Sequence, residues 1–402
     1  MSRFAIVLGA ILCFLPNVSY LADLRYRFDP ALERSVCRNL ICSDRLLLDA
    51  ADRFPGSNEE DRVFAIATLQ EALRRDVGSA DRWCDLGDAF LAAGRVQEAE
   101  YSFKRAVALA PQSPPVFWRA AQFYSRTHEL ARSQEYLGKM LALVPKYKEL
   151  VFDIYAAPGS DVVAAFESGI PREGPLAQDY FRYLLTHNAS LQDVKRAWEW
   201  VQQHGLADDR LAGDYVDWLS NTHEYLLAAE TWKHSVGRHD DSYLNPNLVF
   251  NGSFESSLLQ VGLDWKITET AGVLVSRDST VAFSGSSSLQ IEFDESSNID
   301  FHSVAHEVVA PAGRYHFKAM IRTSDLLTDQ GIGFRLVDSA GAINAQTARV
   351  TGTHDWTPVE VDLTVPAPVR LLQIEVVRQP SWKFDNKVRG KVWIDAVSLV
   401  RL

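Results

Sequence analysis

The hydrophobic periodicity of the chain changes at Asn245. Before this residue, apolar side chains recur at three- and four-residue spacing, which is typical of helices that bury one face. After it, short segments such as Val359-Glu-Val-Asp-Leu-Thr-Val365 alternate between apolar and polar residues, and turn-rich breaks separate them. The change predicts a multidomain α plus β chain, in which a helical region is followed by an antiparallel β-sandwich.

Composition limits what these two regions can do. A chain of 402 residues is long enough for two or three domains. The formal net charge is −11, and both regions share it, with 14 Lys and Arg against 18 Asp and Glu from Asn245 onward and 27 against 34 before it. Neither region is basic, which argues against a nucleic-acid-binding domain.

Residues 1–22 have the pattern of an export signal. Arg3 precedes an apolar run from Phe4 to Leu15, and Pro16 begins a polar break. The cleavage site is poor because Tyr20 occupies a position that favours a small residue, so an uncleaved membrane anchor is the alternative. Both cases predict an exported protein, periplasmic or anchored in the inner membrane. A buried N-terminal helix of a cytosolic protein is the competing interpretation.

The four cysteines give weak signals. Cys13 lies in the N-terminal apolar run, and Cys84 lies in a helical pattern where a small buried side chain is expected. Cys37 and Cys42 are five residues apart, without a second pair or nearby histidines, which makes a zinc site a weak hypothesis. We interpret them as structural and leave a disulfide between them open.

A 34-residue repeat organises the helical region. In residues 80–113 the recurring positions are occupied by Trp83, Leu86, Gly87, Phe90, Ala99, Phe103, Ala106 and Pro111. Residues 114–147 repeat the pattern with Phe117, Ala120, Ala121, Tyr124, Ser133, Leu137, Met140 and Pro145. The pattern resembles the tetratricopeptide repeat, a pair of antiparallel helices.

The resemblance implies an α-solenoid over residues 28–240, because two such repeats need neighbours to bury their faces. Small residues are expected where the two helices of a repeat touch, and each proline where the second helix ends. The family binds protein partners in the groove of its superhelix, so we expect a protein partner here. The tryptophans of this region are expected mostly in the core, and the groove residues cannot be chosen from the signature positions.

Residues 247–402 carry landmarks of a second family. The segment Asn247-Leu-Val-Phe-Asn-Gly-Ser-Phe-Glu255 opens the region, Ser284-Gly-Ser-Ser-Ser-Leu289 follows, and Val392-Trp-Ile-Asp-Ala-Val-Ser-Leu399 closes it. Their order resembles carbohydrate-binding modules with the galactose-binding-like jelly roll. The resemblance implies a poly- or oligosaccharide ligand for this domain.

The same resemblance implies a structural calcium ion. In these modules the glutamate of the opening motif and the aspartate of the closing strand often bind one Ca²⁺, and the corresponding positions are Glu255 and Asp395. Carboxylate oxygens suit calcium, and the ion would join the two ends of the domain. The alternative is that both carboxylates only accept hydrogen bonds from neighbouring turns.

Two groups of residues are candidates for binding sugar. Alternation predicts outward side chains on adjacent strands of one sheet, at Lys318 and Arg322 on one strand, Arg335 on the next strand and Gln373 on another. A solvated polar face explains this pattern equally well. The segment of residues 378–391 holds Trp382 among five basic residues and one acidic residue, a composition that favours stacking on a sugar ring and pairing with uronates or sulfates. An ordinary hairpin is the alternative.

No recognised catalytic motif occurs in the chain. The sequence therefore predicts a non-catalytic exported scaffold, in which the solenoid binds a protein and the jelly roll binds a glycan. The process that we expect such a scaffold to serve is the synthesis, export or assembly of bacterial extracellular polysaccharide. Two alternatives stay open: a structural scaffold whose jelly roll no longer binds sugar, and a glycoside hydrolase whose carboxylates spacing alone cannot reveal.

Overall fold

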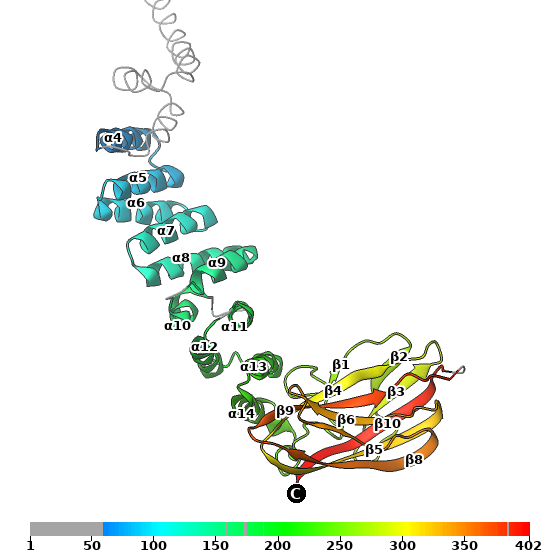
Figure 1. Cartoon of the computed structure of the whole chain (residues 1–402). Coiled ribbons are helices and arrows are strands. Elements are labelled where there is room, and N and C mark those ends of the chain that lie inside the picture. Colours follow the sequence, from blue (N-terminus) through cyan, green and yellow to red (C-terminus); the bar gives the residue numbers. More distant parts are fainter. Residues whose placement is uncertain (1–58, 158–159, 172–174, 188, 384–385) are drawn as a thin grey trace, which may run out of the picture. The chain divides into compact units, whose positions relative to one another are not determined.

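A computed structural model describes residues 59–157, 160–171, 175–187, 189–383 and 386–402. Within these ranges, a helical N-terminal region precedes two packed antiparallel β-sheets (Figure 1). The change of architecture follows Asn245, as the periodicity predicts. The N-terminal signal or anchor of residues 1–22, Cys13, Cys37 and Cys42 lie outside the described residues.

The described helices are mostly of two to four turns. They are α4 (Glu59–Arg75), α5 (Ala80–Ala92), α6 (Val96–Leu109), α7 (Pro114–Arg126), α8 (Leu130–Leu143), α9 (Lys148–Tyr155), α10 (Val162–Ala164), α11 (Leu176–Thr186), α12 (Leu191–Gln203), α13 (Asp209–Asn221) and α14 (Tyr225–Ser235). Short 3₁₀ turns (Pro145–Tyr147 and Gly237–His239) and a π turn (Ala165–Gly169) interrupt the series. No described helix is both long and apolar enough to cross a membrane.

Local sequence explains where these helices begin. The Oγ of Ser79 accepts a hydrogen bond from the N–H of Arg82 at the start of α5, and Asp208 Oδ1 accepts one from Leu211 N–H at the start of α13. Pro114 begins α7, at a position where a missing N–H costs nothing. These caps satisfy donors that the first helical turn leaves without an intrahelical partner.

The repeating positions form the contacts between α5, α6 and α7. A Cβ added at Gly87 would lie 2.7 Å from the ring of Phe103, so only glycine allows α5 and α6 to approach this closely. The Phe103 ring stacks on Phe123 of α7 with centroids 4.9 Å apart. Ala99 and Ala106 are fully buried. These contacts agree with the expected division between small and large residues, while membership of the tetratricopeptide family stays a prediction.

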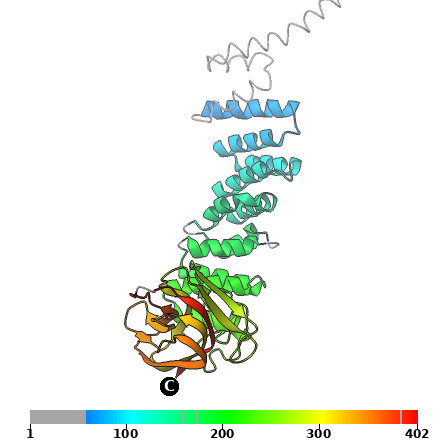
Figure 2. The same cartoon turned by 90° about the vertical axis from the view of Figure 1, so that its right-hand side faces the viewer.

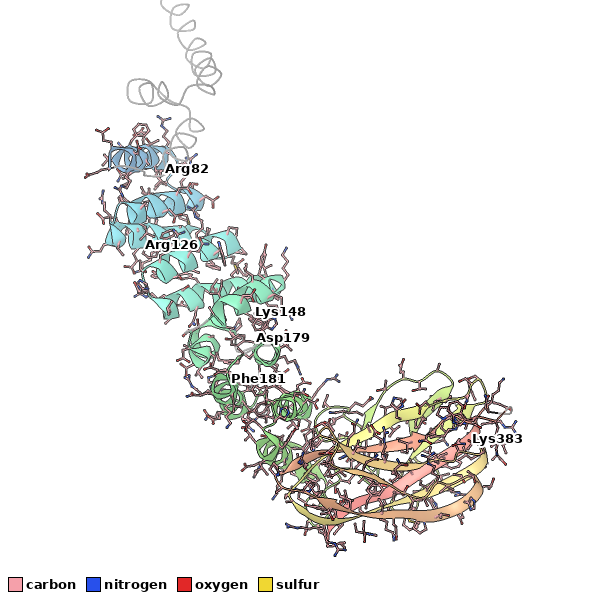
Figure 3. All side chains as sticks on the ribbon, in the orientation of Figure 1. Arg82, Arg126, Lys148, Asp179, Phe181 and Lys383 are labelled. Atoms are coloured by element: carbon pink, nitrogen blue, oxygen red, sulfur yellow. The ribbon has the colours of Figure 1, made fainter. Side chains whose placement is uncertain are left out.

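Contacts divide the chain into two compact units. The first contains α4 to α10 and most of α11 and α12, and the second contains α13, α14 and the described strands. Within the first unit the helices form successive layers (Figure 2). Its layers are also joined by polar contacts, such as the pair between Lys148 Nζ of α9 and Asp179 Oδ2 of α11 at 2.8 Å (Figure 3).

Ten strands are described in the second unit. They are β1 (Lys266–Ile267), β2 (Val273–Asp278), β3 (Ser288–Asp294), β4 (Phe301–Ala310), β5 (Gly313–Leu327), β6 (Gly333–Asp338), β7 (Asn344–Gln346), β8 (Gly352–Val365), β9 (Arg370–Arg378) and β10 (Arg389–Arg401). One sheet has the order β1-β4-β9-β6-β7 and the other β2-β3-β10-β5-β8. Alternate residues such as Leu372, Ile374 and Val376 fill a common core between the sheets.

The opening and closing segments of the sandwich are hydrogen-bonded to each other. The side chain of Asn247 donates to the carbonyl of Val397 at 3.1 Å and accepts from Leu399 N–H at 2.9 Å. The backbone N–H of Val397 in turn donates to the Gly252 carbonyl at 2.8 Å. A Cβ at Gly252 would lie 2.1 Å from the Val397 carbonyl oxygen, which explains the glycine of the opening motif.

The helical hairpin α13–α14 packs on the sandwich. The ring of Trp232 on α14 meets Phe250 edge to face with centroids 5.3 Å apart. Lys266 Nζ of β1 lies 2.7 Å from Asp217 Oδ1 of α13 and 2.8 Å from Glu307 Oε2 of β4. The sequence prediction placed these helices with the solenoid, whereas their contacts place them in one unit with the strands.

Candidate functional site

A polar pocket of about 480 Å³ opens at one end of the β1-β4-β9-β6-β7 sheet. Residues that line it include Asp300, His302, Arg335, Gln346, Arg349 and Trp382. They come from β4 and the residue before it, from β6 and β7, and from the segments that follow β7 and β9. The pocket therefore combines a sheet face with two adjoining loops, which is an arrangement suited to a small polar ligand.

Trp382 is the exposed aromatic residue of this pocket. Its side chain is 97% exposed, although a free indole of this size usually packs against other apolar groups. The neighbouring Ser381 is fixed by Asn298, whose Oδ1 accepts from Ser381 N–H and whose Nδ2 donates to the Ser381 carbonyl, each at 2.8 Å. Lys383, the next residue, projects from the end of the sandwich away from α14 (Figure 3). The indole is thus presented to solvent from an anchored loop.

A row of polar residues crosses the sheet at the pocket. Arg335 on β6 lies opposite Glu375 on β9 and opposite Gln346 on β7. Its Nε and Nη2 lie 2.7 and 2.5 Å from Oε2 of Glu375, a carboxylate that is almost fully buried. This ion pair fixes the guanidinium and leaves about 40% of the Arg335 side chain exposed. Arg335 also lines the pocket.

Arg378 forms part of the pocket wall and is only 1% exposed. Its guanidinium donates to Thr328 Oγ1 at 3.2 Å, to Asn298 Oδ1 at 3.4 Å, to the Asn386 carbonyl at 3.4 Å and to the Ile299 carbonyl. All four acceptors are neutral oxygens. Burial lowers the pKa of the Arg378 guanidinium, although an arginine stays charged at neutral pH.

The structure brings two of the five predicted sugar-binding residues together. Trp382 and Arg335 line the same pocket. Gln373 is exposed on β9 of the same sheet, but it lies opposite Glu307 and Val337, outside the pocket lining.

One prediction about the sugar-binding face is wrong. The strand of Lys318 and Arg322 does not neighbour the strand of Arg335. Both residues lie on β5, which belongs to the other sheet. Lys318 pairs there with Glu360, and Arg322 lies over the Trp393 ring. Alternation identified outward-facing positions but could not show that consecutive strands β5 and β6 cross from one sheet to the other.

Three pocket residues carried no signal in the sequence. His302, Gln346 and Arg349 come from β4, from the three-residue strand β7 and from the segment after β7. Each is an ordinary polar residue in a short or irregular segment. The antiparallel pairing of β6 with β7 and β9, and of β9 with β4, brings them to the pocket that Arg335 lines.

The two carboxylates predicted to bind calcium converge on the turn at residues 283–287. Asp395 Oδ2 accepts from Phe283 N–H at 2.8 Å and Ser284 N–H at 3.0 Å. Glu255 Oε1 accepts from the N–H groups of Ser286 at 2.8 Å and Ser287 at 3.0 Å. These are the hydrogen bonds that the alternative interpretation expects.

A cation fits the charge of this pair. Burial raises the pKa of Asp395, and the charge of Glu255 raises it further. Glu255 itself has a lowered pKa because Ser286 donates to it. Within the described ranges, no three His, Cys, Asp or Glu side chains gather around a common point, so further calcium ligands would have to be backbone oxygens, water, or amide and hydroxyl side chains. The calcium ion stays a prediction.

The helical region holds a second cavity, of about 830 Å³, between α4, α5 and α6. Trp83, Phe90 and Tyr101 supply aromatic surface, and Arg95 lies over the Phe90 ring at 4.6 Å. Trp83 was expected mostly in the core. Its Nε1 donates to the Val77 carbonyl, and its ring meets Tyr101 edge to face while lining this cavity.

Comparisons with known proteins give distant likenesses. No protein-family model matches the sequence, and no curated protein sequence matches it. Among solved structures, a TmCBM61 structure in complex with β-1,4-galactotriose is 21% identical, with a TM-score of 0.29, over 39% of this chain and 99% of that one. The CBM22-1 xylan-binding domain of Paenibacillus barcinonensis Xyn10C is 16% identical, with a TM-score of 0.27, over 37% and 91%.

A further likeness is to the crystal structure of MamA, which is 16% identical with a TM-score of 0.25 over 41% of this chain and 82% of that one. None of these likenesses assigns a function to the chain.

Proposed function

We propose that this chain is a non-catalytic binding protein whose β-sandwich binds a glycan at the pocket beside Trp382. The observation that carries the proposal is the combination of a 97% exposed indole with a polar pocket of about 480 Å³. Sugar rings present apolar C–H faces and hydroxyl edges, so an aromatic face beside hydrogen-bonding side chains is what their recognition requires. The order of the opening and closing sequence motifs supports the same ligand class.

The geometry of the pocket gives each residue a role in this binding. Trp382 would stack on one sugar ring, because its loop is anchored by Asn298 and its indole has no other cover. Arg335 on β6 and Gln346 on the neighbouring strand β7 would bind hydroxyl groups of the sugar. Because Glu375 already orients Arg335, little side-chain entropy is lost when a ligand binds.

The test is glycan-array binding by the full chain and by Trp382→Ala. We expect the variant to bind roughly five- to thirtyfold more weakly, since stacking of one ring on an exposed aromatic contributes on the order of 1–2 kcal/mol. Trp356→Ala is the matched control, because Trp356 lies on β8 of the other sheet, where it contacts Phe283.

No binding by the wild-type chain to any acidic or neutral glycan would contradict the proposal and favour a scaffold with a sandwich that has lost sugar binding. Release of reducing ends from a bound glycan would contradict its non-catalytic part and favour a glycoside hydrolase.

The helical region is proposed to bind a protein partner through the cavity between α4, α5 and α6. Tyr101 is 63% exposed at this cavity beside Trp83 and Phe90, and Arg74, Arg95 and Glu98 surround the aromatic surface. An apolar floor with a polar margin suits a peptide segment with an apolar anchor.

Cross-linking in the source cell tests this part of the proposal. We expect Tyr101→Ala to lose the partner that the wild type captures, while Tyr147→Ala, another exposed tyrosine of the same unit that does not line the cavity, keeps it. Equal capture by both variants would exclude the cavity as the binding surface.

We also propose that the protein acts outside the cytoplasm, as an adaptor in the synthesis, export or assembly of extracellular polysaccharide. The N-terminal pattern of residues 1–22 supports export, and the pairing of a glycan-binding sandwich with a helical unit supports the adaptor role. Fractionation of cells, with the protein detected in the cytoplasmic fraction alone, would contradict it.

A further inference from the structure

The charges around the pocket are unbalanced. Three guanidinium groups line it, those of Arg335, Arg349 and Arg378, against the lining carboxylate of Asp300. Adding Glu375, which pairs with Arg335, leaves a formal excess of one positive charge with His302 neutral. The whole chain carries −11, so the pocket differs in sign from the chain as a whole. A local excess of this kind favours an anionic ligand.

Arg378 contributes most to the positive potential at the pocket wall. Within the described part of the chain, no carboxylate lies within ion-pair distance of its guanidinium, which neutral oxygens hold in place. A buried cation with no carboxylate in direct contact keeps a strong field, because the surrounding protein screens it poorly. Asp329 and Asp300 are the carboxylates whose charges act on it, and both are exposed, so water screens their opposing charges more effectively. Asp329 is also paired with Lys383 at 3.5 Å. The wall of the pocket is therefore electropositive.

Arg349 is the guanidinium best placed to pair with a ligand. Its contacts are two long ones, at 3.5 Å, to the carbonyl oxygen of Gln330 and to Oε1 of Gln346. Among the described residues no carboxylate pairs with it. Arg335 differs, because Glu375 already occupies its Nε and one Nη. Arg349 thus retains donors that can bind a carboxylate in the two-pronged geometry that guanidinium groups favour.

We propose that the pocket selects sugar residues that carry a carboxylate, with Arg349 pairing to that carboxylate while Trp382 stacks on the ring. The ligand class is a polysaccharide that contains hexuronic acid. This inference rests on the proposed function, and it adds the chemical group that distinguishes the bound glycan from neutral ones. A hydroxyl group would satisfy Arg349 less well, because it offers one oxygen and no charge.

The experiment uses the full chain and two forms of one polymer. Polygalacturonate is compared with the same material after its carboxyl groups are reduced to primary alcohols, which keeps the linkages and removes the charge. Alginate and its reduced form provide a second pair. Binding is measured by calorimetry, and we expect each reduced polymer to bind at least about tenfold more weakly, the loss typical of one charge-assisted contact.

Variants separate Arg349 from general electrostatics. Arg349→Gln is expected to lose about tenfold in affinity for the uronate polymers and to change affinity for the reduced ones little. Arg401→Gln is the matched control, since Arg401 is an exposed residue of β10 in the other sheet. It removes the same charge from the chain, and we expect uronate binding to be unchanged.

Each outcome decides one of the two proposals. Equal affinity for the native and reduced polymers overturns the carboxylate selectivity and leaves glycan binding standing. No binding to any of the four polymers, nor to any array glycan, overturns glycan binding and the selectivity with it. Dextran sulfate is a third ligand to compare. If it binds as tightly as polygalacturonate, with the same dependence on Arg349, the pocket recognises negative charge without regard to the carboxylate, and the assignment to uronates is overturned.

Discussion

Lys266 of β1 and Asp217 of α13 form an ion pair, with Nζ and Oδ1 2.7 Å apart, that joins a helix to the edge of the sandwich. Glu307 of β4 binds the same ammonium group at 2.8 Å. Asp217 also accepts a hydrogen bond from Gly262 N–H at 3.0 Å through its other oxygen. The Asp217 carboxylate thus contacts two points of the strand region. The hairpin α13–α14 is therefore part of the same structural unit as the sandwich.

This arrangement predicts how fragments behave. Residues 205–402 should unfold in one cooperative transition, whereas residues 245–402 should have a lower Tm, because removing the hairpin exposes Phe250 and leaves Lys266 with Glu307 alone. Loss of these contacts is expected to cost roughly 2–3 kcal/mol, or about 5–10 °C in Tm. Calorimetry measures both fragments. Equal Tm values would show that the hairpin does not stabilise the sandwich.

Asp264 predicts one pH dependence. Its side chain is fully buried, and burial raises its pKa from 3.8 to about 6. Because the folded-state pKa lies above the unfolded value, the native state gains stability as pH falls from about 6 towards 3.8, and the burial cost is largest above pH 6. The difference corresponds to roughly 3 kcal/mol.

Asp264→Asn should lack this dependence, because an amide does not titrate. We expect the free energy of unfolding of the variant, relative to wild type, to be highest at pH 7 and to decrease by roughly 1–3 kcal/mol by pH 4. Urea unfolding at a series of pH values measures it. A difference that does not vary with pH would show that Asp264 titrates normally.

His306 predicts the opposite dependence. Burial lowers its pKa from 6.5 to about 3, and its Nε2 lies 3.1 Å from the Phe250 carbonyl oxygen. The unfolded chain binds a proton more readily than the folded one, so the contribution of His306 is fully present above pH 6.5 and is lost as pH falls towards 3.

His306→Gln should therefore be less stable than wild type at pH 7 and should lose less stability on acidification. We expect the difference in the free energy of unfolding between wild type and variant to narrow by roughly 1 kcal/mol or more between pH 7 and pH 5. The same urea series measures it. A gap that widens in acid would contradict the assignment of a neutral, buried imidazole.

Glu255 and Asp395 predict that calcium stabilises the sandwich. If Glu255 and Asp395 bind Ca²⁺, the ion stabilises the folded state only, and a concentration of about 100 times the Kd would add roughly 2.7 kcal/mol. We expect the Tm of the wild type to rise by several degrees with calcium and to fall back with chelator. Glu255→Gln should show no rise. Glu295→Gln, which changes an exposed acid that pairs with Arg389, should respond as the wild type does. An unchanged Tm of the wild type would contradict the ion.

The sequence by itself determined the two architectures and the contacts that depend on local chemistry. Periodicity places the change after Asn245, and the repeat identifies Gly87 as a small residue at a helix contact, where a side chain would meet Phe103. The opening and closing motifs predict that the two ends of the sandwich meet, and Asn247 is hydrogen-bonded to Val397. Such features follow from steric fit and hydrogen bonding near the residues concerned.

Tertiary structure alone decided which strands share a sheet, and therefore which residues share a site. Lys318 and Arg335 lie on consecutive strands that belong to different sheets, whereas Arg335 and Arg349 meet at one pocket through strand pairings that the chain order does not reveal. The balance of charge at the pocket likewise depends on Arg378 being buried among neutral oxygens. Alternation specifies which way a side chain points, but strand order arises from packing across the whole sandwich, where distant segments compete to bury their apolar faces.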